Sequence, residues 1–226
     1  MEAVNVRVKT FDLKGVMEYK NQDLLTYDID YPQFASDKYK AFINKLNIYY
    51  KADANLYQKF HVLKLYQMAI DDYEYATSNG FPVREYEVVV KYDLTYNQDC
   101  VISLYIDRYE YTGGAHGMTN RSADTWSLDK GRRMLLSDFF PGQKDYREQI
   151  INNINKQIKD QIESGNNYYF DDYENLVNEN FNERNFYIVP DGVTIFFQLY
   201  EIAPYSSGIM TFLIPFEGKT AKPPKC

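Results

Sequence analysis

Residues 86–111, YEVVVKYDLTYNQDCVISLYIDRYEY, carry the pattern that decides the fold class. Aliphatic and aromatic side chains alternate along residues 86–96 and again along residues 100–111, and a period of two is typical of β-strands. The polar residues 97–99 (Asn-Gln-Asp) separate the two segments and predict a turn. Because apolar residues occur on both faces of each strand, we expect both faces to be at least half covered by other parts of the chain.

Toward the N-terminus, the alternation continues in shorter segments. Residues 4–8 and 24–29 alternate between apolar and polar side chains and predict strands of a small antiparallel sheet. Lys14 and Gly15 are the expected turn between these strands. Pro32 is expected to end the sheet before the next element begins.

A long helical pattern occupies residues 39–73, where apolar side chains recur every three or four positions and leave one polar face. Ser36 is the predicted N-cap, and Asp37 lies in the predicted first turn. The pattern stops at Gly80, which can adopt the left-handed conformation common at helix C-termini. One long helix and two shorter helices joined near residues 52 and 53 both fit this pattern.

The clearest helix lies toward the C-terminus. Isoleucines recur every fourth residue at positions 150, 154, 158 and 162, with polar residues between them. Ser164 and Gly165 end the pattern, and a short amphipathic segment follows at residues 173–181. Three further strands are predicted at residues 185–189, 193–202 and 209–216.

Runs of strands separated by segregated helices predict an α+β fold with antiparallel sheets rather than a doubly wound parallel sheet. The sheets are expected to pack with a long N-terminal helical segment and with an amphipathic helix in the C-terminal part. We place an N-terminal α+β part at residues 1–110 and a C-terminal α+β part at residues 111–218. Residues 219–226 are polar and contain proline, so we expect a flexible tail there.

Composition disfavours several functional classes. The 226 residues include 25 Lys and Arg against 32 Asp and Glu, a formal net charge of −7. This acidic balance disfavours nucleic acid and anionic membranes as partners, because both require clustered Lys and Arg. The sequence has no stretch of about 18 apolar residues that could span a bilayer, and residues 1–10 lack the pattern of a signal peptide. We therefore expect neither a membrane span nor an export signal in this chain.

Cysteine and histidine are too scarce to predict a metal centre. Cys100 falls in a predicted strand and Cys226 is the last residue, so we expect a small buried side chain and a free terminal thiol. Two cysteines and two histidines at unrelated positions disfavour a zinc site. Asp-Asp-Tyr-Glu occurs at residues 71–74 and 171–174 without the loop of an EF-hand, which favours solvated helix faces over calcium ligands. No cofactor is expected.

His116 lies in a glycine-rich segment, and two interpretations are open. Glycines let backbone N–H groups approach a ligand and histidine titrates near neutral pH, so His116 is a candidate for contact with a ligand or partner. Alternatively, Gly113, Gly114 and Gly117 form a structural turn while the imidazole bonds to backbone groups. We favour the structural turn and predict no catalytic residue, because no Ser-His-Asp or Cys-His pairing can be drawn.

Tyrosine is unusually frequent, with 23 residues, and most of them fall at positions expected to pack in the core or on a sheet face. Exposed tyrosines are candidates for partner contacts because the ring offers rigid apolar area and a hydroxyl group. Pro204, Tyr205 and Ser206 form a loop of paratope-like composition and are predicted to contact a partner. A hairpin connection whose tyrosine packs on its own sheet is the alternative. Tyr168 and Tyr169 are further candidates.

Several motifs in this order resemble the extracytoplasmic domain pair of bacterial RsiV-type anti-sigma factors. They are Tyr31-Pro32-Gln33, residues 111–117 (YTGGAHG), 135–140 (LLSDFF), 200–205 (YEIAPY) and 214–216 (IPF). In anti-sigma factors of this type the domain pair senses lysozyme, and a similar non-catalytic region precedes the enzyme domain of some peptidoglycan deacetylases. The Gly-Gly-Ala-His-Gly element together with the Ala-Pro-Tyr loop is the most specific part of the resemblance.

The resemblance implies a non-catalytic binding or sensing module of the bacterial cell envelope, outside the cytoplasm, with lysozyme or a peptidoglycan-type glycan as its partner. An acidic surface suits a basic partner such as lysozyme, since complementary charge speeds encounter. The sigma-binding segment and the membrane helix that precede the domain pair in anti-sigma factors do not occur in this sequence. We therefore do not expect the signalling role to transfer.

Two other hypotheses remain open. The chain could be a hydrolase acting on a wall or glycan substrate with His116 and nearby carboxylates of residues 171–174, which requires an open pocket with the imidazole in reach of a carboxylate. It could instead be a structural or oligomeric part, for which an extensive symmetric apolar interface would be the sign. The sequence predicts neither an oligomeric state nor the natural ligand.

Overall fold

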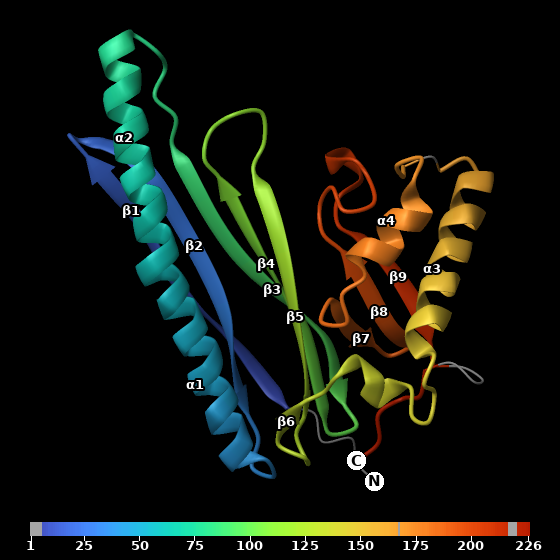
Figure 1. The fold of residues 1–226 in the computed structure, drawn as a ribbon. Helices are drawn as coiled ribbons and strands as arrows, with labels where there is room; N and C mark the ends of the chain where they lie inside the picture. Colours follow the sequence, from blue (N-terminus) through green and yellow to red (C-terminus); the bar gives the residue numbers. More distant parts are fainter. Residues whose placement is uncertain (1–5, 167, 217–220) are drawn as a thin grey trace. The chain divides into compact units, whose positions relative to one another are not determined.

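The computed structural model describes residues 6–166, 168–216 and 221–226 (Figure 1). Contacts divide this described chain into two compact units. The N-terminal unit comprises residues 6–92 and 106–120, and the C-terminal unit comprises residues 93–105 and 121–226. The linear domain boundary predicted between residues 110 and 111 stays a prediction.

The fold is α+β, as predicted, and the described residues form two sheets of mainly antiparallel strands. The order is β1-β2-β3-β4-β5-β6 in the larger sheet and β7-β8-β9 in the smaller one. The strands of the larger sheet are β1 (Arg7–Tyr19), β2 (Gln22–Ala35), β3 (Tyr86–Gln98), β4 (Val101–Tyr111), β5 (Met118–Ser127) and β6 (Arg132–Arg133). β2 and β3 pair in parallel, because a helical crossover joins them.

The β1–β2 hairpin turns at a different place from the predicted one. β1 continues through Gly15, and the chain reverses at Lys20 and Asn21, whose φ angles are 50° and 61°. Two positive φ angles suit a tight hairpin because the twist of such a turn matches the strands. Gly15 is needed for another reason, since a Cβ atom there would lie 2.5 Å from the hydroxyl oxygen of Tyr27. The predicted turn was wrong because this glycine makes room for a ring.

Pro32 and Ser36 also differ from their predicted roles. Pro32 lies inside β2, opposite Thr10 of β1, and the strand continues beyond it. Ser36 accepts a hydrogen bond from the backbone N–H of Tyr39 (3.4 Å). It does not cap the helix, which begins only at Lys40.

A continuous helical segment joins β2 to β3. It consists of α1 (Lys40–Leu56), a π-helical stretch (Tyr57–Val62) and α2 (Leu63–Asn79). Of the two predicted alternatives, the single long helical segment is therefore correct. The helix geometry changes at the π-helical stretch and not at residues 52 and 53, where a junction between two helices was the alternative. Gly80 ends the segment with a φ of 72°, as predicted. α1 packs on β2 (Figure 1). Between them, the ring centroids of Tyr50 and Phe34 lie 5.8 Å apart.

In the C-terminal unit, two helices pack on the smaller sheet (Figure 1). These elements are α3 (Tyr146–Glu163), α4 (Tyr173–Asn180), β7 (Phe186–Val189), β8 (Gly192–Phe197) and β9 (Met210–Pro215). Ile150, Ile154 and Ile158 are buried in the core that α3 shares with these strands, as their spacing predicted. β8 ends earlier than predicted, and residues 199–201 form a turn. In the ranges that the structure describes, none of the helices combines the length and the apolar character needed to cross a membrane.

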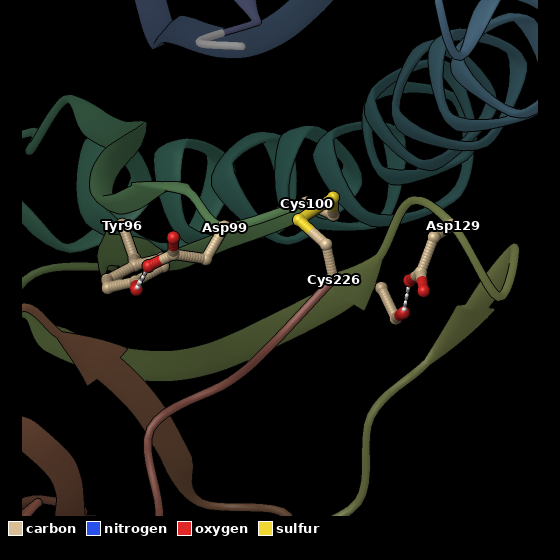
Figure 2. The surroundings of a disulfide bond; sticks show 6 residues. Tyr96, Asp99, Cys100, Asp129 and Cys226 are labelled. Atoms are coloured by element: carbon tan, nitrogen blue, oxygen red, sulfur yellow. Dashed lines mark hydrogen bonds between the residues drawn. A yellow bond between two sulfur atoms is a disulfide. The ribbon is translucent and has the colours of Figure 1, made fainter. Parts of the chain in front are cut away.

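A disulfide bond joins Cys100 and Cys226, which are 126 positions apart in sequence (Figure 2). Their Cα atoms lie 5.4 Å apart. The expected free terminal thiol was therefore wrong. Neither cysteine lies in a recognisable spacing motif, and only the fold brings the end of the chain to the turn between β3 and β4.

Further contacts hold the residues that precede Cys226. Ala221 is fully buried, and the backbone N–H of Lys222 donates to the carbonyl oxygen of Phe139 (2.7 Å). The predicted flexible tail is corrected for residues 221–226, because these contacts and the disulfide bond hold them in place. Residues 219 and 220 lie outside the described residues.

Candidate functional site

The loop between β8 and β9 carries the predicted contact residues Pro204, Tyr205 and Ser206. Pro204 and Ser206 are exposed, and Tyr205 is half-buried in a single 3-10 turn. The side chain of Tyr200 is 48% exposed, and the centroid of its ring lies 5.8 Å from that of Tyr205. Sequence reasoning missed Tyr200, because its pattern placed this residue inside a strand.

Hydrogen bonds to β5 and to α4 hold this loop in place. The side-chain Nε2 of Gln198 donates to the carbonyl oxygen of Arg121 in β5 (2.6 Å), and the N–H of Arg121 donates back to Oε1 of Gln198 (2.9 Å). The N–H of Gln198 donates to Oε2 of Glu201 (2.6 Å), and Nδ2 of Asn180 donates to the carbonyl oxygen of Glu201 (3.0 Å). Burial raises the pKa of the Glu201 carboxyl, although its bond to the Gln198 backbone opposes this shift. A loop held in this way loses little conformational entropy when it binds a partner.

The segment before α4 adds a third tyrosine. Oγ of Ser207 donates to the carbonyl oxygen of Tyr168 (2.9 Å), whose side chain is 57% exposed. Tyr169 is only 7% exposed, donates its hydroxyl to Oε1 of Gln161 (2.6 Å), and has its pKa raised to about 12 by burial. Tyr169 is therefore a core residue, and its selection as a contact candidate was wrong. We call the following residues the tyrosine patch: Tyr168, Tyr200, Pro204, Tyr205 and Ser206.

Acidic residues adjoin the tyrosine patch. The backbone N–H of Phe170 donates to the carbonyl oxygen of Ile202 (3.1 Å), which links this segment to the tyrosine loop. Asp171 and Asp172 follow directly, and both are exposed. The carboxylate of Asp172 accepts a hydrogen bond from Nδ2 of Asn175 (2.6 Å). The two aspartates of the second Asp-Asp-Tyr-Glu copy are therefore exposed to solvent just before α4 begins. They place negative charge beside the patch.

The glycine-rich turn connects β4 and β5 in the N-terminal unit. Gly113 and Gly114 have φ angles of 90° and 95°, which favour glycine, and a Cβ atom on Gly117 would lie 2.5 Å from the carbonyl oxygen of Glu110. His116 is exposed, and its Nδ1 lies 3.0 Å from the carbonyl oxygen of Gly117. These backbone angles and distances suit a structural turn, and a partner contact by His116 stays a prediction.

The predicted site residues are distributed over both units. His116 belongs to the N-terminal unit, whereas the tyrosine patch and residues 171–174 belong to the C-terminal unit. In the first Asp-Asp-Tyr-Glu copy, at residues 71–74, Asp72 accepts a hydrogen bond from the hydroxyl of Tyr86 (2.5 Å). Across the described ranges, no group of three or more His, Cys, Asp or Glu side chains is arranged to hold a metal ion.

One polar cluster could not be recognised from the sequence. In the π-helical stretch, the rings of Tyr57 and His61 stack with their centroids 4.7 Å apart. The hydroxyl of Tyr57 donates to Oε1 of Glu110 (2.6 Å), and Nε2 of His61 contacts the same oxygen. Burial, followed by the bond to Glu110, raises the pKa of Tyr57. Because β4 supplies Glu110, the cluster ties the π-helical stretch to the sheet of the N-terminal unit.

The fold and the loops together define a two-unit α+β protein, and two family models match successive parts of it. Residues 18–119 match the model described as "Deacetylase PdaC". Residues 137–217 match the model described as "Protein of unknown function (DUF3298)". No curated protein matches the chain.

Two solved structures have a similar fold over nearly their whole length. A DUF3298 family member from Bacteroides fragilis is 20% identical, with a TM-score of 0.67, covering 95% of this chain and 92% of that one. A DUF3298 family protein from Pseudomonas aeruginosa is 16% identical, with a TM-score of 0.61, covering 96% of this chain and 95% of that one. At these identities the likeness establishes the fold alone.

Proposed function

We propose that this chain is a non-catalytic binding module of the cell-envelope type, comparable to the domain pair of RsiV-type proteins. It recognises a protein or a peptidoglycan-type glycan through the tyrosine patch. The observation that carries this proposal is the pair formed by the exposed ring of Tyr200 and the half-buried ring of Tyr205, whose centroids lie 5.8 Å apart on a loop that Gln198 holds against β5. Rigid rings with a hydroxyl group suit both a protein hot spot and stacking on a sugar.

Charge beside the patch favours a basic partner. Asp171 and Asp172 are exposed on the segment that Phe170 links to the tyrosine loop, and the whole chain has a formal net charge of −7. A strongly basic protein such as lysozyme would approach this surface with complementary charge. The matched deacetylase model names an enzyme, but its matching region, residues 18–119, does not contain the tyrosine patch.

Titration tests the proposal directly. We expect lysozyme or soluble peptidoglycan fragments to bind in calorimetry at low salt, and more weakly at moderate salt, because salt screens charge pairs. Replacing both rings of this pair, Tyr200→Ala with Tyr205→Ala, should weaken binding at least about tenfold. Tyr75→Ala is the matched control, since Tyr75 is 65% exposed in the N-terminal unit. If neither ligand binds at millimolar concentration, the proposal fails.

The hydrolase hypothesis makes a different prediction. It requires the wild-type protein to release product from a wall or glycan substrate, and requires His116→Ala to abolish this activity. As a binding module, the protein should release no product, and His116→Ala should leave the affinity of the tyrosine patch unchanged. Product analysis by mass spectrometry after incubation with peptidoglycan fragments distinguishes the two.

A further inference from the structure

The outer side of the long helical segment in the N-terminal unit carries exposed apolar side chains. Ile48 of α1, Phe60 of the π-helical stretch, and Leu56 and Leu63 on either side of that stretch are each at least half exposed. The inner side of the segment is apolar as well, because its buried residues pack toward the sheet. A helix on the surface of a protein usually has a polar outer side, so this segment departs from the ordinary amphipathic pattern.

Lysines are interleaved with these apolar side chains. Lys45, Lys51, Lys59 and Lys64 are all exposed. Residues 38–64 contain six lysines, a single aspartate and no glutamate, in a chain whose formal net charge is −7. The acidic balance of the whole chain, which disfavours an anionic partner, is therefore reversed along this segment. We use the name lysine face for the four exposed lysines and the four exposed apolar residues together: Lys45, Lys51, Lys59, Lys64, Ile48, Leu56, Phe60 and Leu63.

Carboxylates that lie near the lysine face are bonded to other groups. Asp53, the aspartate of this segment, accepts a hydrogen bond from Nη2 of Arg108 (2.7 Å). Glu110 of the adjoining sheet accepts the hydroxyl of Tyr57 (2.6 Å) and contacts Nε2 of His61. In the ranges that the structure describes, none of the four lysines of the face forms an ion pair with a carboxylate. Their ammonium groups are therefore available to anionic groups outside the protein.

Further carboxylates bound the lysine face at its two ends. Asp37 precedes α1, and Asp71 and Asp72 follow in α2. Asp71 accepts a hydrogen bond from Nε2 of Gln67 (3.1 Å), and Asp72 accepts one from the hydroxyl of Tyr86. These three aspartates limit the positive surface to the part of the segment between them.

A cavity of about 490 Å³ lies beside the lysine face. Met17 and Tyr27 of the β1–β2 hairpin line it, together with Lys59 and Leu63 of the face. Nε2 of Gln58, another lining residue, donates to the hydroxyl of Tyr27 (2.9 Å), so these two polar groups are paired with each other. Among the described residues that line the cavity, Lys59 is the one that carries charge. A largely apolar cavity beside an ammonium group suits a hydrocarbon chain attached to an anionic group.

We infer that the lysine face docks on the surface of a bilayer that contains anionic lipids. The ammonium groups lie at the level of the lipid phosphates while the exposed apolar side chains enter between the headgroups, as in helices that lie in the plane of a membrane interface. The face extends over residues 45–64, about 30 Å of helix at 1.5 Å per residue. This inference does not rest on the tyrosine patch, which belongs to the other unit.

The apolar part of the surface favours lipid over other anionic partners. Nucleic acid would neutralise the lysines but leave Ile48, Phe60 and the cavity uncovered. The carboxylates of an acidic protein likewise have no use for an apolar cavity, whereas an acyl chain can fill it.

Co-sedimentation of the whole chain with vesicles tests the inference. Vesicles of phosphatidylcholine alone are compared with equimolar vesicles of phosphatidylcholine and phosphatidylglycerol. We expect the protein to sediment with the mixed vesicles at low salt, to sediment less at high salt, and to remain in solution with phosphatidylcholine. Equal binding to both vesicles would overturn the role of charge, and binding to neither would overturn the docking surface. Binding to soluble polyglutamate without binding to vesicles would indicate an acidic protein partner and overturn the lipid surface.

Lysine variants locate the contact. Lys59→Ala with Lys64→Ala should weaken binding to the mixed vesicles at least about tenfold, since each lysine near an anionic surface adds to the attraction. Lys156→Ala with Lys159→Ala removes the same charge from exposed positions of α3 in the C-terminal unit and should leave binding unchanged. Equal weakening by both pairs would overturn the assignment to the lysine face.

Apolar variants separate lipid insertion from charge alone. Phe60→Ala with Leu63→Ala keeps every charge and should weaken binding to the mixed vesicles at least about fivefold, because apolar area is lost from the contact. Tyr75→Ala, which removes an exposed ring of α2 outside the face, is the matched control. All of these positions are exposed, so the variants should fold, and circular dichroism checks this. Unchanged binding of the Phe60 and Leu63 double variant would overturn the insertion of apolar side chains.

The tyrosine patch provides a last comparison. Tyr200→Ala with Tyr205→Ala should bind the mixed vesicles as tightly as the wild-type protein does, even where it loses affinity for lysozyme or peptidoglycan fragments. Loss of vesicle binding in this variant would place the lipid contact in the C-terminal unit and overturn the inference.

Discussion

Cys226, the last residue of the chain, is bonded to Cys100 at the turn between β3 and β4. The bond encloses most of the C-terminal unit, because the two cysteines are 126 positions apart. It therefore restricts the unfolded chain strongly and, in the folded protein, fixes the end of the described chain to the turn between β3 and β4.

Removing this bond should destabilise the C-terminal unit. For a loop of this length, the chain-entropy account gives about 5 kcal/mol. We expect Cys100→Ser with Cys226→Ser to lower Tm by about 10 °C in scanning calorimetry. Dithiothreitol should shift the wild-type Tm to the same value and leave that of the double variant unchanged. A reduced wild-type protein as stable as the oxidised one would contradict this prediction.

Stability should fall in alkaline solution, because burial raises the pKa of several tyrosines above the ordinary value of 10.0, including Tyr86, Tyr96 and Tyr169. A folded-state pKa above the unfolded one means that the folded protein retains its protons longer. This contribution to stability is complete below pH 10 and is lost as the pH rises through the folded-state values. We expect the free energy of unfolding to decline between about pH 10 and 12 in urea denaturation.

Tyr169→Phe should make this decline shallower, because the pKa of Tyr169 in the folded state is about 12. Tyr168→Phe is the matched control, since Tyr168 is the exposed neighbour. Tyrosinate absorbance, recorded along the same pH series, shows when the buried rings ionise. A wild-type protein that is equally stable at pH 9 and pH 11 would refute the alkaline effect.

Gly117→Ala should destabilise the N-terminal unit by about 1–3 kcal/mol. The added Cβ atom would lie 2.5 Å from the backbone oxygen of Glu110 and equally close to the ring of Tyr109, so the backbone must shift. The midpoint of urea denaturation measures this effect. Ala115→Ser, at an exposed position of the same turn, should change stability by less than about 0.5 kcal/mol. Equal stability of both variants would contradict the close approach at Gly117.

Gln198→Ala should weaken partner binding severalfold without removing a residue of the tyrosine patch. The substitution leaves the N–H and carbonyl groups of Arg121 without their bonds to Gln198, and the loop that carries Tyr200 loses this support. The rate of dissociation, measured by surface plasmon resonance, should rise most, because the loop must then be ordered in each complex. Asn175→Ala, which removes a hydrogen bond only at the start of α4, is the control.

Local patterns in the sequence predicted the elements well and some of their details poorly. The period of two along β3 and β4, the isoleucine repeat of α3 and the end of α2 at Gly80 all agree with the structure. Gly15 did not mark a turn, since the space beside its Cα is needed by the ring of Tyr27. The residue type alone cannot distinguish a glycine needed for its backbone angle from one needed for its size.

The candidate site was predicted only in part. The composition of the 204–206 loop made Pro204, Tyr205 and Ser206 candidates, and their contact with a partner stays a prediction. It did not reveal the hydrogen bonds between Gln198 and Arg121, which are 77 positions apart. The periodicity also could not reveal that Tyr169 points into the core while Tyr168 remains exposed.

The sequence by itself determined the fold class and the inner faces of the main helices, because burial follows short-range periodicity in polar and apolar residues. Only the tertiary structure decided which distant residues meet: Cys226 with Cys100, Glu110 with Tyr57, and Gln198 with Arg121. These pairings depend on strand order, register and the path of the chain end. None of these leaves a periodic signal in the neighbouring residues, so the contacts exist only once the whole chain is folded.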